Sequence, residues 1–84
     1  MTALVINKGK PAQATWRYFY EARKAAGLTQ VQLAKRCRLW QNQIGKWERG
    51  EHAPLPEHYT VLADALGIQV NDFAVEVANF FSAR

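Results

Sequence analysis

The sequence predicts an all-α fold, because helix-start signals and apolar residues at helical spacing recur along the chain. Thr29 and Gln32 have the spacing of a capping box, in which the Thr hydroxyl accepts from the Gln32 amide and the Gln32 side chain bonds back to the cap. A helix should therefore begin at Gln30. A second helical pattern restarts a few residues later, with apolar side chains at i, i+4 and i+7: Trp40, Ile44 and Trp47.

Three further helices complete an expected arrangement of five. The first lies between Pro11, which suits a first helical turn, and Gly27, which suits the position after a helix end. One of its sides carries three residues expected in the core and one arginine: Trp16, Phe19, Ala26 and Arg23. The fourth helix covers about 57–66 and ends at Gly67, and the last covers about 70–81.

The helix that begins at Gln30 should bury Leu33, Ala34 and Cys37 and end near Arg38. Its connection to the next helix is so short that the two must cross. Ala34 is small enough to let them approach closely.

The outward face of the third helix is the candidate recognition surface. With Ile44 and Trp47 turned inward, this face carries amides, a cation and one glycine, and no acid. The candidate base contacts are Gln41, Asn42, Gln43, Gly45 and Lys46. Gln and Asn pair bidentately with adenine, Lys donates to guanine acceptors, and the DNA major groove admits a helix. A solvated polar face is the alternative interpretation.

Residues spaced in register over roughly 19–73 form a composite motif. They are Arg23, Gly27-Leu28-Thr29-Gln30, Leu33-Ala34, Ile44, Glu48-Arg49-Gly50, Pro54 and Leu62-Ala63-Asp64-Ala65-Leu66-Gly67. This motif resembles the pattern of the Cro/C1-type (XRE-type) helix-turn-helix family. The resemblance implies a compact, lambda-repressor-like domain of five helices that binds double-stranded DNA. It also implies a structural ion pair between Arg23 and Glu48, and a backbone phosphate held by Gln30.

Three positions depart from the family pattern. Arg38 replaces the usual glycine of the turn, so either a left-handed residue is strained there or the turn has another shape. Trp40 replaces the small polar cap of the third helix; we expect its ring against the second helix, with contact to the DNA backbone or a thymine methyl as the alternative. Gly45 lies inside a helix, at a cost of about 1 kcal/mol relative to Ala, which indicates a close approach or simple drift.

Charge is divided unequally along the chain. Residues 1–50 hold ten of the eleven Lys and Arg residues and two acids, whereas residues 51–84 hold one Arg and five acids. The N-terminal part should therefore meet phosphate, and the C-terminal part should be repelled by it. The candidate phosphate contacts are Gln30, Arg49, Lys35, Arg38 and Arg17.

The last helix carries more apolar residues than are needed to pack one of its faces against the domain. We expect its second half to form a homodimer interface, made of Val77, Phe80 and Phe81. A two-fold dimer would place two recognition helices about 34 Å apart, one turn of B-DNA. The alternative is that this helix folds back on its own domain.

The remaining residues indicate no catalytic, metal or membrane role. Residues 1–10 are expected to be an N-terminal arm, or a short strand that pairs with a second copy, ahead of a single domain over 11–84. Cys37 is the only cysteine, and with His52 and His58 it makes no metal set of known spacing. The sequence shows no catalytic triad, phosphate loop or paired carboxylates, and no bilayer-spanning run or signal peptide. We therefore expect a cytoplasmic protein with no cofactor and no enzymatic activity, and the family resemblance implies a prokaryotic or phage origin.

The function expected from these features is sequence-specific binding of double-stranded DNA. The protein would be a transcription regulator, and a repressor that binds a near-palindromic operator as a dimer is favoured. One alternative is the antitoxin of a toxin–antitoxin pair, with a toxin partner on the C-terminal apolar face. A second is a protein-interaction module that has lost DNA affinity.

Overall fold

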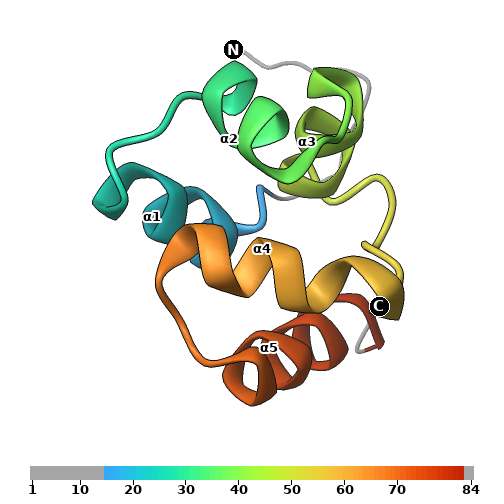
Figure 1. Ribbon diagram of the computed structural model, residues 1–84. Coiled ribbons are helices and arrows are strands. Elements are labelled where there is room, and N and C mark those ends of the chain that lie inside the picture. The colour runs from blue at the N-terminus through green and yellow to red at the C-terminus, as the bar shows by residue number, and fades with distance from the viewer. Residues whose placement is uncertain (1–14, 83–84) are drawn as a thin grey trace, which may run out of the picture.

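The computed structural model describes residues 15–82, which form five α-helices and no strand. The helices are α1 (Arg17–Ala25), α2 (Gln30–Cys37), α3 (Gln41–Glu48), α4 (Tyr59–Leu66) and α5 (Val70–Ser82), with a short 3-10 helix, η2 (Pro56–His58), before α4. Figure 1 shows α2 and α3 side by side at one end of the molecule, α5 at the other end, and α4 between them. The all-α prediction is confirmed for the described residues. The predicted arm over 1–10 lies outside them.

Helix α1 is shorter than the sequence predicts. Residues 15 and 16 are not helical, and Pro11, expected in the first turn, lies outside the described residues. The Trp16 amide donates to the carbonyl of Glu48 at 2.7 Å, so it is not available to a helix that would start earlier. This bond instead ties the chain before α1 to the end of α3.

The end of α1 also differs from the prediction. Ala26, expected in the core, is exposed. The helix ends at Ala25, and the chain turns through Gly27, whose φ of +75° is in the left-handed region that glycine tolerates. Ala26 therefore lies in the turn rather than on the inner face of the helix.

Helix α2 begins as its capping box predicts. The Gln32 amide donates to the Thr29 hydroxyl at 3.1 Å, and the Thr29 amide donates to Gln32 Oε1 at 2.9 Å. The helix ends at Cys37, and Arg38 follows it with φ 60° and ψ 42°. The turn therefore keeps its left-handed residue although glycine is absent, and the alternative of a differently shaped turn is wrong.

One core joins all five helices. Its buried apolar residues are Trp16, Phe19, Leu33, Ala34, Cys37, Ile44, Trp47, Leu62, Ala63, Leu66, Phe73 and Val77. The Trp16 ring stacks on Phe19 with ring centroids 5.2 Å apart and lies 5.7 Å from the ring of Phe73. These aromatic contacts fix α5 against α1, on the side away from α2.

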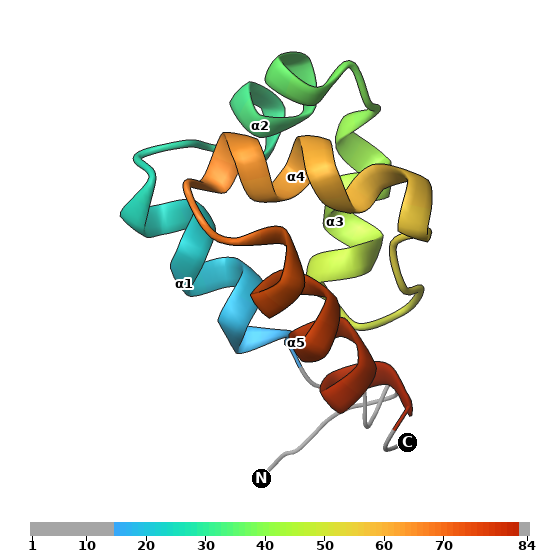
Figure 2. The same ribbon diagram turned by 60° about the horizontal axis from the view of Figure 1, so that its bottom comes forward.

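Helix α5 packs on its own domain. Val77 is buried, and Phe80 and Phe81 are half-buried, with their ring centroids 5.9 and 5.0 Å from that of Trp16. Figure 2 shows the second half of α5 beside the start of α1. The alternative prediction, that the last helix folds back on its own domain, therefore holds for the single chain. Because Val77 is covered within the chain, a dimer interface on α5 would use Phe80 and Phe81.

Candidate nucleic-acid interface

Helix α3 is anchored by its inner side and presents the other side to solvent. Ile44 is fully buried and Trp47 is 5% exposed, as the sequence predicts. The side chains of Gln41, Asn42 and Lys46 are exposed. The structure thus places these three candidate base contacts on one outward surface, which we call the α3 face, at the end of the molecule that Figure 1 shows at the top.

A buried ion pair connects α3 to α1. Arg23 Nε donates to Glu48 Oε1 at 2.8 Å, and Nη2 donates to Glu48 Oε2 at 2.9 Å. Arg23 Nη1 also donates to the carbonyl of Leu28, so all three guanidinium nitrogens have partners. The hydrogen bond to Glu48 raises the pKa of Arg23, against the opposing effect of burial. Glu48 is therefore a structural acid within this network.

Gln30 links this ion pair to the α3 face. Its Nε2 donates to Glu48 Oε2 at 3.3 Å, and its Oε1 accepts from Gln41 Nε2 at 2.8 Å. Because the amide of Gln30 is oriented by a fixed carboxylate, the amide of Gln41 is oriented in turn. A hydrogen-bond chain thus runs from the interior to a candidate base contact.

Gly45 is buried beneath two side chains. A Cβ at this position would lie 2.9 Å from Arg49 Nη1 and 3.6 Å from Gln30 Oε1. The distance to Gln30 Oε1 is an ordinary contact, so the missing side chain makes room chiefly for the guanidinium at the end of α3. Base contact by Gly45 itself remains a prediction.

The start of α3 is capped by Gln43. Its Oε1 accepts a hydrogen bond from the Trp40 amide at 2.9 Å, while the indole offers no acceptor for a cap. Gln43 is half-buried, so it takes a capping role in addition to the predicted base contact. Trp40 is 76% exposed, and the prediction that its ring packs on α2 is wrong.

The candidate phosphate contacts lie in different settings. Lys35 and Arg38 are exposed on α2 and at its C-terminal end. Arg17 is exposed at the start of α1 and pairs with Glu21 at 2.7 Å. Arg49 donates through Nε to Glu51 at 2.7 Å, and this hydrogen bond raises the pKa of the guanidinium. Contact of these side chains with phosphate remains a prediction.

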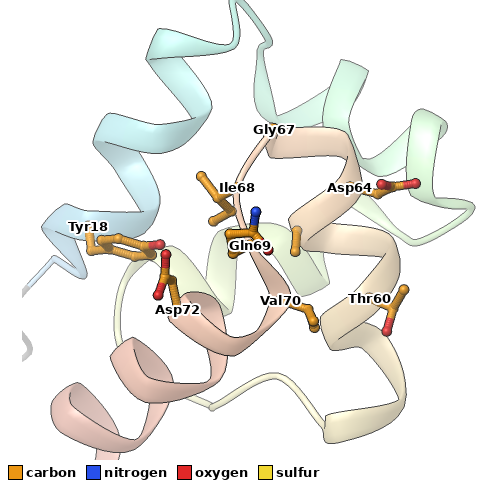
Figure 3. A pocket seen from close by; sticks show the side chains of 9 residues that line it. Tyr18, Thr60, Asp64, Gly67, Ile68, Gln69, Val70 and Asp72 are labelled. Carbon is orange, nitrogen blue, oxygen red and sulfur yellow. The ribbon is translucent and has the colours of Figure 1, made fainter.

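The opposite side of the molecule has the wrong charge for phosphate. Figure 3 shows a groove between α1 and the α4–α5 connection, in which the Tyr18 hydroxyl and the Asp72 carboxylate point toward one another. Burial, followed by the charges of Glu76 and Asp72, raises the pKa of Tyr18. Asp64 also lines the groove. Such a surface repels a polyanion, so we place the candidate nucleic-acid interface on α2 and α3.

Three contacts at the interface were not predicted. They are the Gln30–Gln41 hydrogen bond, the Gln43 cap and the Arg49–Glu51 ion pair. Gln43 follows Trp40 at the capping-box spacing already recognised at Thr29, so this signal was present in the sequence. The other two join residues whose approach depends on how α2 crosses α3 and how the chain leaves α3. No periodic pattern marks such pairs.

Residues 15–82 contain neither a metal-binding cluster nor a membrane span. No group of three or more His, Cys, Asp or Glu side chains in this part of the chain is arranged to hold a metal ion. None of the helices described is long and apolar enough to cross a bilayer.

Comparison with known proteins assigns the family. A helix-turn-helix family model matches residues 19–73, which is more than half of the chain. Neither the curated proteins nor the solved structures contain a match to this chain. The matched segment begins in α1, ends in α5 and includes the whole of α2 and α3. The chain therefore belongs to the Cro/C1-type (XRE) helix-turn-helix family, whose members bind double-stranded DNA.

Proposed function

We propose that the protein is a transcriptional repressor that binds a near-palindromic operator as a homodimer. The observation that carries this proposal is the α3 face, where Gln41, Asn42 and Lys46 project from a helix whose other side is held in the core. These side chains offer amide and ammonium groups that match adenine and guanine edges in the major groove. A dimer that occupies a promoter in this way would exclude polymerase.

Exposed cations on α2 and just after it support a division of roles. Lys35 and Arg38 would contribute affinity that falls as salt rises, because their contacts to phosphate release counterions. Gln30 lies at the N-terminus of α2, where free amides and the helix dipole favour an anion. We propose that Gln30 holds a phosphate while it orients Gln41, so that the backbone contact sets the register for base recognition.

Apolar surface on α5 supports self-association. Phe80 and Phe81 are half-buried in the single chain. A second copy could cover these side chains by two-fold symmetry, and it would bring two recognition helices to one face of the DNA.

Selection of bound duplexes from a random pool at moderate salt tests the proposal. We expect a two-fold symmetric consensus, and sedimentation of the complex should show two chains on each duplex. A consensus without symmetry, bound by one chain, would remove the dimer but keep the DNA-binding function. No enrichment, together with salt-independent binding, would instead favour the alternative of a protein-interaction module.

The antitoxin alternative assigns the same α5 surface to another protein. It predicts a monomeric chain in the absence of a toxin, and a stable complex when a toxin encoded beside it is co-expressed. Substitution of Phe81 by Ala should then weaken that complex and leave the oligomeric state of the isolated chain unchanged, with circular dichroism to show that the helices are retained. Under the homodimer proposal the same substitution should release monomers.

A further inference from the structure

Arg49 extends from the end of α3 back over the α3 face. Its amide donates to the carbonyl of Gly45 at 2.9 Å, so Arg49 remains in helical register one turn after the glycine. Helical side chains lean toward the N-terminus of their helix. The guanidinium accordingly lies over Gly45, with Nη1 2.9 Å from the position that a Cβ would take. A side chain at residue 45 would occupy this space.

Glu51 fixes the orientation of this guanidinium. Arg49 Nε donates to Glu51 Oε2 at 2.7 Å, whereas no hydrogen bond from Nη1 or Nη2 is found within residues 15–82. The Arg49 side chain is 55% exposed. The carboxylate therefore holds the guanidinium through one edge, and the terminal nitrogens remain available to a ligand that approaches the α3 face.

We infer that Arg49 recognises a guanine of the operator, and that Glu51 is the residue that positions it. The inference rests on the DNA-binding function proposed above. Guanine presents two acceptors in the major groove, N7 and O6, and a guanidinium can donate to both at once. Held by Nε alone, Arg49 presents Nη1 and Nη2 as such a pair. Gly45 leaves the space that this arrangement needs.

This assignment differs from the phosphate contact expected from the sequence. A phosphate contact needs a cation at the rim of the interface and tolerates a mobile side chain. Arg49 is instead oriented by an acid whose negative charge would itself be repelled by a nearby phosphate. A carboxylate that restrains an arginine favours recognition of one planar base edge over attraction to any phosphate.

The test compares base preference in the intact chain and in three variants: Arg49→Ala, Arg49→Lys and Glu51→Gln. Duplexes selected from a random pool identify the consensus, and titrations at several salt concentrations give affinities. At one guanine of each half-site the unmodified protein should prefer guanine by about tenfold or more. Arg49→Ala should lose this preference and keep the others. Arg49→Lys should weaken it because Lys has no planar pair of donors, and Glu51→Gln should weaken it because a neutral amide oxygen holds the guanidinium less strongly than the carboxylate does.

A base analogue makes the test specific for the acceptor. Replacement of that guanine by 7-deazaguanine removes N7 and should weaken binding by the unmodified protein. The same replacement should have no effect on Arg49→Ala. Arg36→Ala and Glu57→Gln are charge-matched controls at exposed positions that do not bond to Arg49, and both should keep the guanine preference. Circular dichroism of each variant shows whether the helices are retained.

Two results would overturn the inference and can be told apart. If Arg49→Ala weakens all duplexes equally and lowers the slope of log affinity against log salt by about 0.9, Arg49 contacts phosphate and the proposed function stands. If the unmodified protein selects no sequence, the proposed function and this inference both fail.

Discussion

Arg23 and Glu48 meet through two parallel hydrogen bonds, at 2.8 and 2.9 Å, although the two residues are 25 positions apart in the sequence. Both side chains are less than a tenth exposed. This pair fixes the end of α3 against α1, and through Gln30 it also orients the first residue of the α3 face. The core and the candidate recognition surface therefore share one carboxylate.

Removal of one partner of this pair should be more harmful than removal of both. Arg23→Met leaves the Glu48 carboxylate buried without its cation, so we expect the free energy of unfolding to fall by about 3 to 5 kcal/mol. The double variant Arg23→Met/Glu48→Met should recover most of that stability, since it buries no unpaired charge. Urea unfolding followed by circular dichroism measures the free energy of unfolding of the single and the double variant. A single variant within about 1 kcal/mol of the unmodified protein would contradict a stabilising role.

Glycine should relieve the turn after α2. Arg38 has a φ of 60°, a backbone conformation that residues other than glycine adopt only at an energetic cost. We expect Arg38→Gly to raise the free energy of unfolding by about 1 kcal/mol. Arg38→Ala is the matched control, because it removes the same charge but keeps the strain. Equal effects of the two variants in thermal unfolding would indicate that charge, and not backbone conformation, is responsible.

The three tryptophans should differ sharply in their contributions to stability. Trp16 is 1% exposed, Trp47 5% and Trp40 76%. Trp47→Ala should lower the free energy of unfolding by about 3 to 5 kcal/mol, whereas Trp40→Ala should change it by less than about 0.5 kcal/mol. Acrylamide should quench chiefly Trp40, and this component should disappear in Trp40→Phe. If operator DNA leaves the quenching unchanged, Trp40 does not lie in the interface.

Base recognition and phosphate binding should respond differently to substitution. Gln41→Ala and Lys46→Ala should each reduce discrimination between operator and random duplex by about 1 to 3 kcal/mol, the usual value of a bidentate pair with a base. Lys35→Ala should weaken binding to both duplexes alike and lower the salt dependence. Titrations of each variant against both duplexes at two salt concentrations measure this. Similar effects of all three variants on both duplexes would refute the division of roles.

Stability should decrease at alkaline pH in a way that depends on Cys37. Burial raises the pKa of its thiol, although the charge of Arg36 opposes the shift. The unfolded chain therefore loses the thiol proton at a lower pH than the folded chain does. The Cys37 contribution to the free energy of unfolding should be complete below the ordinary thiol pKa of about 8.5 and should decline as pH rises toward the raised value.

Urea unfolding of the protein and of Cys37→Ala across this pH range isolates the effect, because other titrating groups are shared. The difference in the free energy of unfolding between the unmodified protein and Cys37→Ala should become smaller as pH increases. A difference that stays constant would show that the folded and unfolded thiols titrate together.

Local signals predicted most of the helices. The reciprocal bonds of Thr29 and Gln32 involve neighbours in sequence, and the inward side of α3 follows from the spacing of Ile44 and Trp47. The start of α1 was predicted wrongly because the Trp16 amide bonds to Glu48 from a distant helix. The exposed position of the Trp40 ring was not predicted, because no spacing in the sequence marks the direction of a side chain at a helix start.

The sequence by itself determined the fold class, the family and the outward side of α3, because each depends on residue types at short, fixed spacings. Only the tertiary structure decided what covers that side. The crossing of α2 over α3 brings Gln30 onto Gln41, and the exit of the chain from α3 brings Glu51 to Arg49. The packing of α5 on Trp16 was decided in the same way. The Gln30–Gln41 contact and the packing of α5 depend on the relative positions of whole helices, to which no single spacing in the chain corresponds, and the Arg49–Glu51 contact depends on the backbone path after α3.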